Sequence, residues 1–240
     1  MLEKTRAIAL RITNYAENSV VAHLYTESFG LQSYLINGAK KPKAKIHVNM
    51  LQPLHLLELV VYHKDNNNLQ RIKEAQQSPP LRSIPIQIIK SALAMFLNEV
   101  LYKVLKHQNP DPYLFNFIHR SILWLDDSQA NLSNFHLVFL IKLSKYLGFL
   151  PLANSDKRPY MDLVDGIFVK NLPAHIHVLQ EPHTSLFHDL MNVSYDEASS
   201  VSINHQDRIY LLEKILDFYK LHTENFGTVN SLYILEEIFH

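Results

Sequence analysis

The chain contains no cysteine, only five glycines, and no apolar run of membrane-spanning length. The lack of cysteine excludes disulfides, thiolate metal sites and a cysteine nucleophile. Few glycines leave little material for a phosphate-cradling loop, and no nucleophile elbow, P-loop or His-Glu-x-x-His motif occurs. The N-terminus alternates charge too early for the apolar core of a signal peptide, and no run approaches the about 20 apolar residues of a membrane span. We therefore expect a cytoplasmic protein that is not an enzyme and has no contact with a membrane.

Basic residues are concentrated at the front of the chain, although the whole chain has no formal net charge. Residues 1–82 contain 11 Lys and Arg against 6 Asp and Glu, whereas residues 83–240 contain 12 against 17. A basic N-terminal part and an acidic C-terminal part indicate two modules with different partners. The alternative is chance variation on solvated surfaces.

Alternation of apolar and polar residues predicts five short strands before the chain turns helical. They are expected at residues 5–13, 19–27, 31–37, 47–62 and 69–75. Pro53 inside the fourth run implies a bulge or an edge. Five strands in about 75 residues leave no room for crossover helices, so the pattern favours a small closed barrel such as an OB-fold. An SH3-like barrel is the alternative.

A helical period replaces the strand period after the boundary at Gln77-Ser78-Pro79-Pro80. Helices are expected near residues 86–107, 111–125, 132–147, 184–192, 206–224 and 231–239. Ile86 and Ile89 belong to the expected inward face of the first helix, and Phe239 to that of the last. Asp111-Pro112 is the expected cap and first-turn proline of the second. Between them, four prolines and an Asp165-Gly166 turn predict an irregular segment with a β-hairpin. The predicted fold class is α+β: an OB-fold domain at 1–78, then a mainly α-helical domain at 79–240 that contains the hairpin insertion at 151–182.

The stretch from Asn37 to Lys45 is the strongest functional signal, because four lysines fall within six residues and no acid occurs between Glu27 and Glu58. An exposed loop of this kind is suited to phosphate binding. Two arginines extend the basic face, and two strand tyrosines are placed to stack on unpaired bases for about 1–3 kcal/mol each. The predicted nucleic-acid-binding residues are Lys40, Lys41, Lys43, Lys45, Arg6, Arg11, Tyr25 and Tyr34. The alternatives are a solubilising lysine surface and tyrosines that belong to the core.

Other polar clusters carry weaker signals. His175 and His177 share one face of an extended segment, but a zinc site needs three or four converging ligands. We therefore predict no metal and no cofactor. Asp126-Asp127 and Glu236-Glu237 are adjacent pairs near predicted helix ends, where neighbouring side chains point in different directions. Their pattern indicates solvated surface, not paired catalytic carboxylates.

Several stretches, in their order and spacing across nearly the whole chain, resemble the RecO family of bacterial DNA repair proteins. They are Thr5-Arg6-Ala7-Ile8-Ala9-Leu10, His23-Leu24-Tyr25-Thr26-Glu27, Phe29-Gly30, Asn37-Gly38-Ala39-Lys40-Lys41-Pro42-Lys43, Gly148-Phe149-Leu150-Pro151, Arg208 through His222, and Ser231-Leu232-Tyr233-Ile234-Leu235. The Asn37 stretch is similar to the basic loop of that family. Some members carry a four-cysteine zinc module in the region matching 154–182, and this chain has lost it.

The resemblance implies an OB-fold followed by a helical domain. It also implies binding of single- and double-stranded DNA, annealing of complementary strands, and loading of the recombinase RecA onto DNA coated with the single-stranded DNA-binding protein SSB. The implied partners are RecR and the C-terminal tail of SSB, and the implied place is the bacterial cytoplasm, at the nucleoid during repair. Two other readings remain open from the residues: an RNA-binding OB-fold protein, and a helical scaffold that binds only protein.

Overall fold

The computed structural model describes residues 1–64, 69–152 and 158–238. The chain forms two compact units, Met1–Ser128 and Gln129–His240, and each is described here by itself. Within the described ranges, no helix is both long and apolar enough to cross a bilayer. The predicted loop at 65–68 and the predicted inward position of Phe239 lie outside the described residues.

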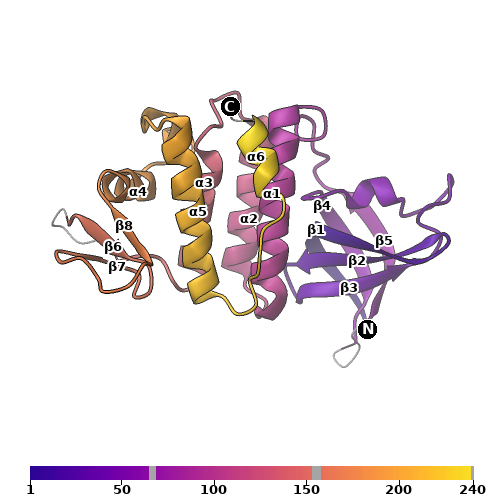
Figure 1. Ribbon diagram of the computed structural model, residues 1–240. Helices are drawn as coiled ribbons and strands as arrows, with labels where there is room; N and C mark the ends of the chain where they lie inside the picture. Colours follow the sequence, from indigo (N-terminus) through magenta and orange to yellow (C-terminus); the bar gives the residue numbers. More distant parts are fainter. Residues whose placement is uncertain (65–68, 153–157, 239–240) are drawn as a thin grey trace. The chain divides into compact units, whose positions relative to one another are not determined.

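Five strands of the first unit close into a barrel in the order β1-β2-β3-β5-β4 (Figure 1). They are β1 (Leu2–Ala16), β2 (Ser19–Thr26), β3 (Gly30–Ile36), β4 (Leu56–Tyr62) and β5 (Gln70–Gln77). The long β1 pairs antiparallel with both β2 and β4, and the parallel pairing of β3 with β5 completes the closure. Closure leaves no open sheet edge. The predicted OB-fold barrel and the α+β class are confirmed.

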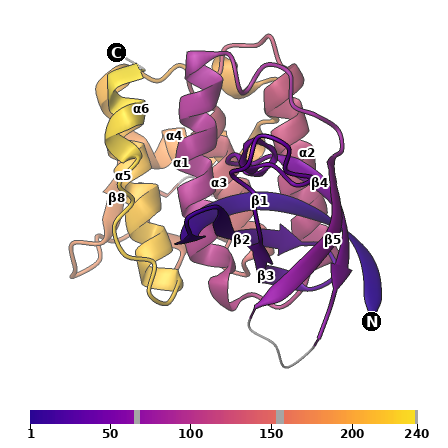
Figure 2. The ribbon, with the colours of Figure 1, turned by 90° about the vertical axis from the view of Figure 1, so that its right-hand side faces the viewer.

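Strand β1 is buried on both faces where it passes the helices of its unit. Ala7 and Ala9 lie in the barrel core, whereas Ile8 and Leu10 alternate to the opposite face and are also buried. The amide of Asn98 in α1 (Ile88–Val104) donates a hydrogen bond to the carbonyl of Leu10 at 2.6 Å. Figure 2 shows β1 and β2 crossing in front of this helix. A helix therefore covers the outer face of the barrel at β1.

The fourth predicted strand, at 47–62, is wrong in its first half. Residues Val48–Leu51 form a 3-10 helix, and β4 begins only at Leu56. Between them, Leu54 adopts a positive φ of 62°, and its N–H donates to the carbonyl of Ala9 at 2.8 Å. The apolar run supplies core residues, but Pro53 and this turn interrupt its strand pairing.

Two helices follow the barrel within the same unit. α1 is succeeded by a 3-10 turn, Leu105–His107, and α2 (Pro112–Asp127) begins after its predicted cap, Asp111. The Asp111 carboxylate accepts from the N–H of Tyr113 at 2.8 Å and of Leu114 at 3.3 Å. Both helices group with the barrel in Met1–Ser128. The division into domains at residue 78 stays a prediction.

The start of the first helix differs from its prediction. The expected helix began near residue 86, with Ile86 and Ile89 on its inward face. Helix α1 begins at Ile88, and Ile86 and Ile89 are 78% and 45% exposed. The hydrophobic periodicity therefore starts two residues before the helix does, and the side chains of Ile86 and Ile89 face outward.

A buried polar cluster precedes α1, and it corrects the surface position predicted for Asp126. The Asp126 carboxylate accepts three backbone N–H bonds at 2.8 Å, from Arg82, Ser83 and Ile84. The buried ammonium group of Lys90 donates to the carbonyl of Asp126 at 2.7 Å. Burial opposes the charge on Asp126, but the backbone hydrogen bonds outweigh it and hold its pKa below the usual value. The cluster fixes the segment that leads from the barrel into α1.

The second unit combines four helices with a small sheet. The helices are α3 (Phe135–Tyr146), α4 (His183–Asn192), α5 (His205–His222) and α6 (Leu232–Ile238). The sheet has the order β7-β6-β8, from β6 (Tyr160–Asp162), β7 (Ile167–Val169) and β8 (Val178–Gln180). The predicted hairpin around Asp165-Gly166 is confirmed. β8 is an additional strand that was not predicted, because a strand of three residues is too short to show a periodic pattern.

Candidate nucleic-acid interface

The lysine loop, residues 37–47, connects β3 to the 3-10 helix and is shaped by two tight turns. Gly38 has a positive φ of 69°, and the N–H of Lys41 donates to its carbonyl at 3.0 Å. The N–H of Ala44 then donates to the carbonyl of Lys41 at 3.0 Å. Glycine adopts this backbone region without strain, so Gly38 sets the direction in which the loop leaves β3.

Two small apolar anchors fix the lysine loop to the barrel. Ala39 is fully buried and Ile46 is 9% exposed, and both belong to the barrel core. The carbonyl of Ala39 accepts from the N–H of Val48 at 3.0 Å, and the N–H of Lys40 donates to the carbonyl of Asn18 at 3.3 Å. The loop is therefore held at both ends by core packing and backbone hydrogen bonds, while the residues between the anchors face solvent.

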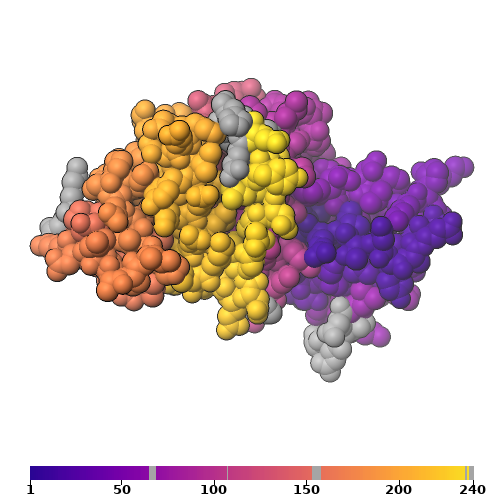
Figure 3. All heavy atoms as spheres, in the orientation of Figure 1, coloured from indigo at the N-terminus to yellow at the C-terminus, as the bar shows by residue number. Residues whose placement is uncertain are grey.

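All four lysines of the loop, Lys40, Lys41, Lys43 and Lys45, are exposed. None forms an ion pair with a residue in the described part of the chain. Their positive charges are thus available to an external anion. Figure 3 shows the indigo and purple atoms of the barrel and its loops at the surface of the first unit. Four uncompensated ammonium groups on a fixed loop are suited to a polyanion such as a nucleic-acid backbone.

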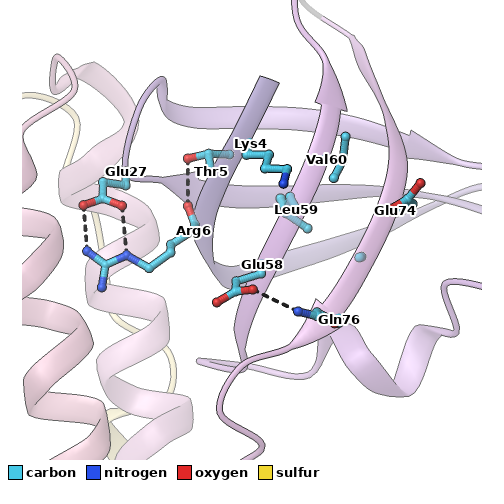
Figure 4. Close-up of a pocket in the computed structure, with 10 residues that line it drawn as sticks. Lys4, Thr5, Arg6, Glu27, Glu58, Leu59, Val60, Glu74 and Gln76 are labelled. Atoms are coloured by element: carbon cyan, nitrogen blue, oxygen red, sulfur yellow. Dashed lines mark hydrogen bonds and ion pairs between the residues drawn. The ribbon is translucent and has the colours of Figure 1, made fainter. Parts of the chain in front are cut away.

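Arg6 has a different environment from the loop lysines. Its guanidinium group donates to the Glu27 carboxylate at 2.9 and 2.6 Å (Figure 4). It also donates to the Asn116 side-chain oxygen at 2.8 Å. It also lies 5.1 Å from the ring centroid of Phe115 in α2. The hydrogen bond to Arg6 is the main reason that the pKa of Glu27 is lowered. Arg6 therefore joins the barrel to α2, and its charge is already balanced.

The structure corrects the predicted stacking role of Tyr25 and Tyr34. Both side chains are fully buried. Tyr34 lies in the barrel core, whereas Tyr25 faces outward and is covered by Phe115, with ring centroids 5.9 Å apart. Burial raises the pKa of both hydroxyls above the usual range. Neither ring has a face open to a nucleotide base, so the core alternative is the one observed.

Arg11 is exposed, and the structure places it beside residues that the sequence did not indicate. Its guanidinium carbon lies 5.2 Å from the ring centroid of Tyr102, and the ammonium group of Lys106 lies 4.8 Å from the same centroid. These α1-region residues are more than ninety positions from Arg11 in the chain. No sequence pattern connects positions that far apart, so only the tertiary fold reveals the cluster.

A shallow cavity of about 620 Å³ opens on the barrel between β1, β4 and β5 (Figure 4). Its lining mixes the cations of Lys4 and Arg6 with the carboxylates of Glu58 and Glu74. Hydrogen bonds from Gln76 and Ser78 hold the pKa of Glu58 below the usual value. With both signs of charge on its walls, this cavity is a weaker site for a polyanion than the lysine loop.

Two histidines of the second unit, His175 and His183, each lie beside a single carboxylate. His175 Nε2 lies 3.1 Å from Asp162 Oδ2, and His183 Nε2 lies 2.9 Å from Asp207 Oδ1. No group of three or more potential metal ligands occurs among the described residues. Asp162 also accepts from the N–H of Val164 at 2.8 Å. In the proline-rich segment, the Asp162 carboxylate thus binds His175, one of the two histidines weighed as metal ligands, and a backbone N–H.

A closed barrel that carries an unpaired basic loop, followed by a mainly helical part, defines a two-part class of barrel protein. The family model described as "Recombination protein O N terminal" matches residues 1–79, and "Recombination protein O C terminal" matches residues 87–230. The chain belongs to the RecO family.

Full-length relatives agree with this assignment. Two are proteins named DNA repair protein RecO, from Azobacteroides pseudotrichonymphae at 39% identity over 241 residues and from Bacteroides fragilis at 35% over 241 residues. A third with the same name, from Porphyromonas gingivalis, is 31% identical over 245 residues. In all three comparisons the match covers 100% of this chain and 100% of the relative. The family predicted from the sequence motifs is therefore confirmed.

Proposed function

We propose that the protein is a non-enzymatic mediator of recombinational DNA repair in the bacterial cytoplasm. It binds single- and double-stranded DNA, anneals complementary strands, and helps to load RecA onto SSB-coated DNA together with RecR. Its DNA contacts are Lys40, Lys41, Lys43 and Lys45 of the lysine loop, with Arg11. The exposure of these four unpaired lysines on a barrel of the RecO family is the observation that carries the proposal.

Charge neutralisation explains how binding promotes annealing. Two DNA strands repel each other through their phosphates, and a cation that contacts a phosphate releases a condensed counterion. A fixed group of ammonium charges therefore lowers the repulsion between two strands held at the same surface. The contact reads no base sequence, which suits a protein that must pair any two complementary strands.

Tethering explains the contribution of the helical part. We propose that it binds the C-terminal tail of SSB, so that the barrel meets the coated DNA at a high effective concentration. The capture of DNA then becomes a local event. A synthetic tail peptide should lower the recruitment of the protein to SSB-coated DNA while leaving its binding to bare DNA unchanged.

A fluorescence titration of single-stranded DNA across a salt series tests the proposal. The variant Lys40→Glu with Lys41→Glu removes two phosphate contacts, so the slope of log affinity against log salt should become shallower by about 1.4. The matched control is Lys145→Glu with Lys170→Glu, two exposed lysines of the second unit. The control has the same change in net charge and should retain the wild-type slope.

The same titration distinguishes the alternatives. An unchanged slope in the Lys40 and Lys41 variant would exclude the loop from the interface. Salt-independent or absent binding to any nucleic acid would favour a scaffold that binds only protein. Competition that strongly prefers RNA to DNA of the same sequence would favour a role in RNA handling.

A further inference from the structure

A second group of cations lies on the first unit, around the half-buried ring of Tyr102 in α1. The guanidinium carbon of Arg11 in β1 lies 5.2 Å from the ring centroid, and the Lys106 ammonium nitrogen lies 4.8 Å from it. The imidazole of His23 in β2 meets the ring edge-on, with centroids 5.6 Å apart. One aromatic ring thus holds groups from two strands and from the end of a helix in one place.

The two cations are exposed and uncompensated. Neither Arg11 nor Lys106 forms an ion pair with any residue in the described ranges. By contrast, Lys103, one helical turn before Lys106, lies 3.7 Å from the Glu99 carboxylate. A tyrosine ring attracts cations through its face, which positions them but does not neutralise their charge.

The positive charges of Arg11 and Lys106 also act on His23, the third group beside the Tyr102 ring. Burial, together with the charges of Arg11 and Lys106, keeps the pKa of this imidazole below its usual value. Its Nδ1 lies 2.9 Å from the Ser33 hydroxyl, which fixes the ring on the barrel. A phosphate accepts hydrogen bonds from a guanidinium fork and from an ammonium group, so each of the two cations beside this ring is a suitable donor to a phosphate.

The register of β2 relates this cluster to the lysine loop. Arg11 pairs with His23, and four residues earlier Ser19 approaches Asn37 at the base of the loop, with their side-chain oxygens 3.5 Å apart. Four residues of strand span about 13 Å. One DNA strand carries a phosphate about every 3.4 Å of helix axis, so about four nucleotides cover this distance. A strand bound at the loop can therefore reach the cluster without leaving the barrel surface.

We propose that Arg11 and Lys106, held by Tyr102, form a second phosphate-binding point that continues the path of nucleic acid from the lysine loop. This inference rests on the proposed function and extends it from Arg11 to Tyr102 and Lys106, two residues that the sequence did not indicate. Arg11 and Lys106 make the contact, and Tyr102 is a positioning residue. The partner is the sugar-phosphate backbone of a nucleic acid strand, recognised by charge without base readout.

The test is the salt dependence of single-stranded DNA binding by Arg11→Gln with Lys106→Gln. Loss of one or two phosphate contacts should make the slope shallower by about 0.7–1.4 relative to wild type. The control is Lys103→Gln, which removes one positive charge at the end of α1, three residues before Lys106, but from a lysine that is already paired. The control should retain the wild-type slope.

Tyr102 is tested by rescue. Tyr102→Leu removes the aromatic face and should make the slope of log affinity against log salt shallower. Tyr102→Phe retains the face and should show the wild-type slope. A purely structural role would lower stability in Tyr102→Leu without changing the slope. Urea unfolding of both variants separates the two effects.

The outcomes for the two proposals differ. If the Lys40 and Lys41 variant loses slope and the Arg11 and Lys106 variant does not, the second binding point and the DNA contact assigned to Arg11 are wrong, whereas the proposed function of the lysine loop stands. If both variants lose slope by the expected amounts, both hold. If the wild-type protein binds no DNA at any salt concentration, the proposed function fails and this inference fails with it.

Discussion

The Arg6 guanidinium donates two parallel hydrogen bonds to the Glu27 carboxylate, at 2.9 and 2.6 Å, between the first two strands of the barrel. The same guanidinium donates to Asn116 in α2 at 2.8 Å. Arg6 was predicted to belong to the basic binding face, but it links the barrel to α2 instead. This geometry separates the roles of the two N-terminal arginines, because Arg11 has no such carboxylate partner in the described structure.

Substitution of Arg6 is expected to affect stability more than DNA binding. Arg6→Gln removes a bidentate charged pair that is partly exposed, so we expect the free energy of unfolding to fall by about 1–2 kcal/mol. The salt slope of DNA binding should change little, because Glu27 already balances this charge. Urea unfolding and the salt titration measure the two effects separately. A slope change as large as that of Lys40→Glu with Lys41→Glu would place Arg6 in the interface after all.

Gly38 is expected to control the lysine loop through its backbone. Gly38→Ala changes no charge, but a left-handed φ of 69° costs a residue with a Cβ about 1–2 kcal/mol. We expect weaker DNA binding because the loop leaves β3 in a different direction. Gly148→Ala is the control, since Gly148 also has a positive φ, of 86°, but lies outside the barrel. It should lower stability by a similar amount and leave DNA affinity unchanged.

The buried tyrosines give a test of core packing against base stacking. The hydroxyl groups of Tyr25 and Tyr34 have no hydrogen-bond partner among the described residues. An unsatisfied buried polar group costs about 1–3 kcal/mol, so Tyr34→Phe should retain or increase the free energy of unfolding. Tyr34→Ala should lower it by about 3–5 kcal/mol through the cavity it creates. Tyr34→Phe should bind DNA like wild type, and weaker binding by this variant would contradict the core assignment.

His136 in α3 is expected to make stability depend on pH. It is 1% exposed, and burial, assisted by the charge of Arg208, lowers its pKa to about 3. The unfolded chain takes up a proton near pH 6.5 that the folded chain does not, so stability present above pH 6.5 is lost as the pH falls toward 3. We expect a loss of about 1–2 kcal/mol between pH 7 and pH 5.

Urea unfolding at pH 7, 6 and 5 measures this dependence. His136→Leu cannot titrate and should show a flatter profile over this interval than wild type. His188→Gln, at a histidine whose side chain is 44% exposed, should retain the wild-type profile. An equally steep profile in His136→Leu would show that another group is responsible.

Local patterns predicted the parts of the fold that depend on neighbours in sequence. Alternation located the barrel strands, because a strand half-buried on a barrel repeats every two residues. The Asp111-Pro112 cap and the Asp165-Gly166 turn were also readable, since each depends on the backbone of a few adjacent residues. The pattern failed at 47–55, where a 3-10 helix and a turn at Leu54, whose N–H donates to the carbonyl of Ala9 in β1, replace the expected strand.

The sequence by itself determined the barrel, its helical continuation, and a loop with four lysines and no nearby acid. Charge and periodicity are properties of consecutive residues, so they can be read without a structure. Only the tertiary structure decided which polar residues are free to act. Alternation places Tyr25 on the outer face of its strand, but it does not reveal that Phe115 of α2 covers that face. In the same way, folding places the Glu27 carboxylate beside Arg6 and balances its charge. Arg11 has no carboxylate partner in the described residues, so its charge stays free.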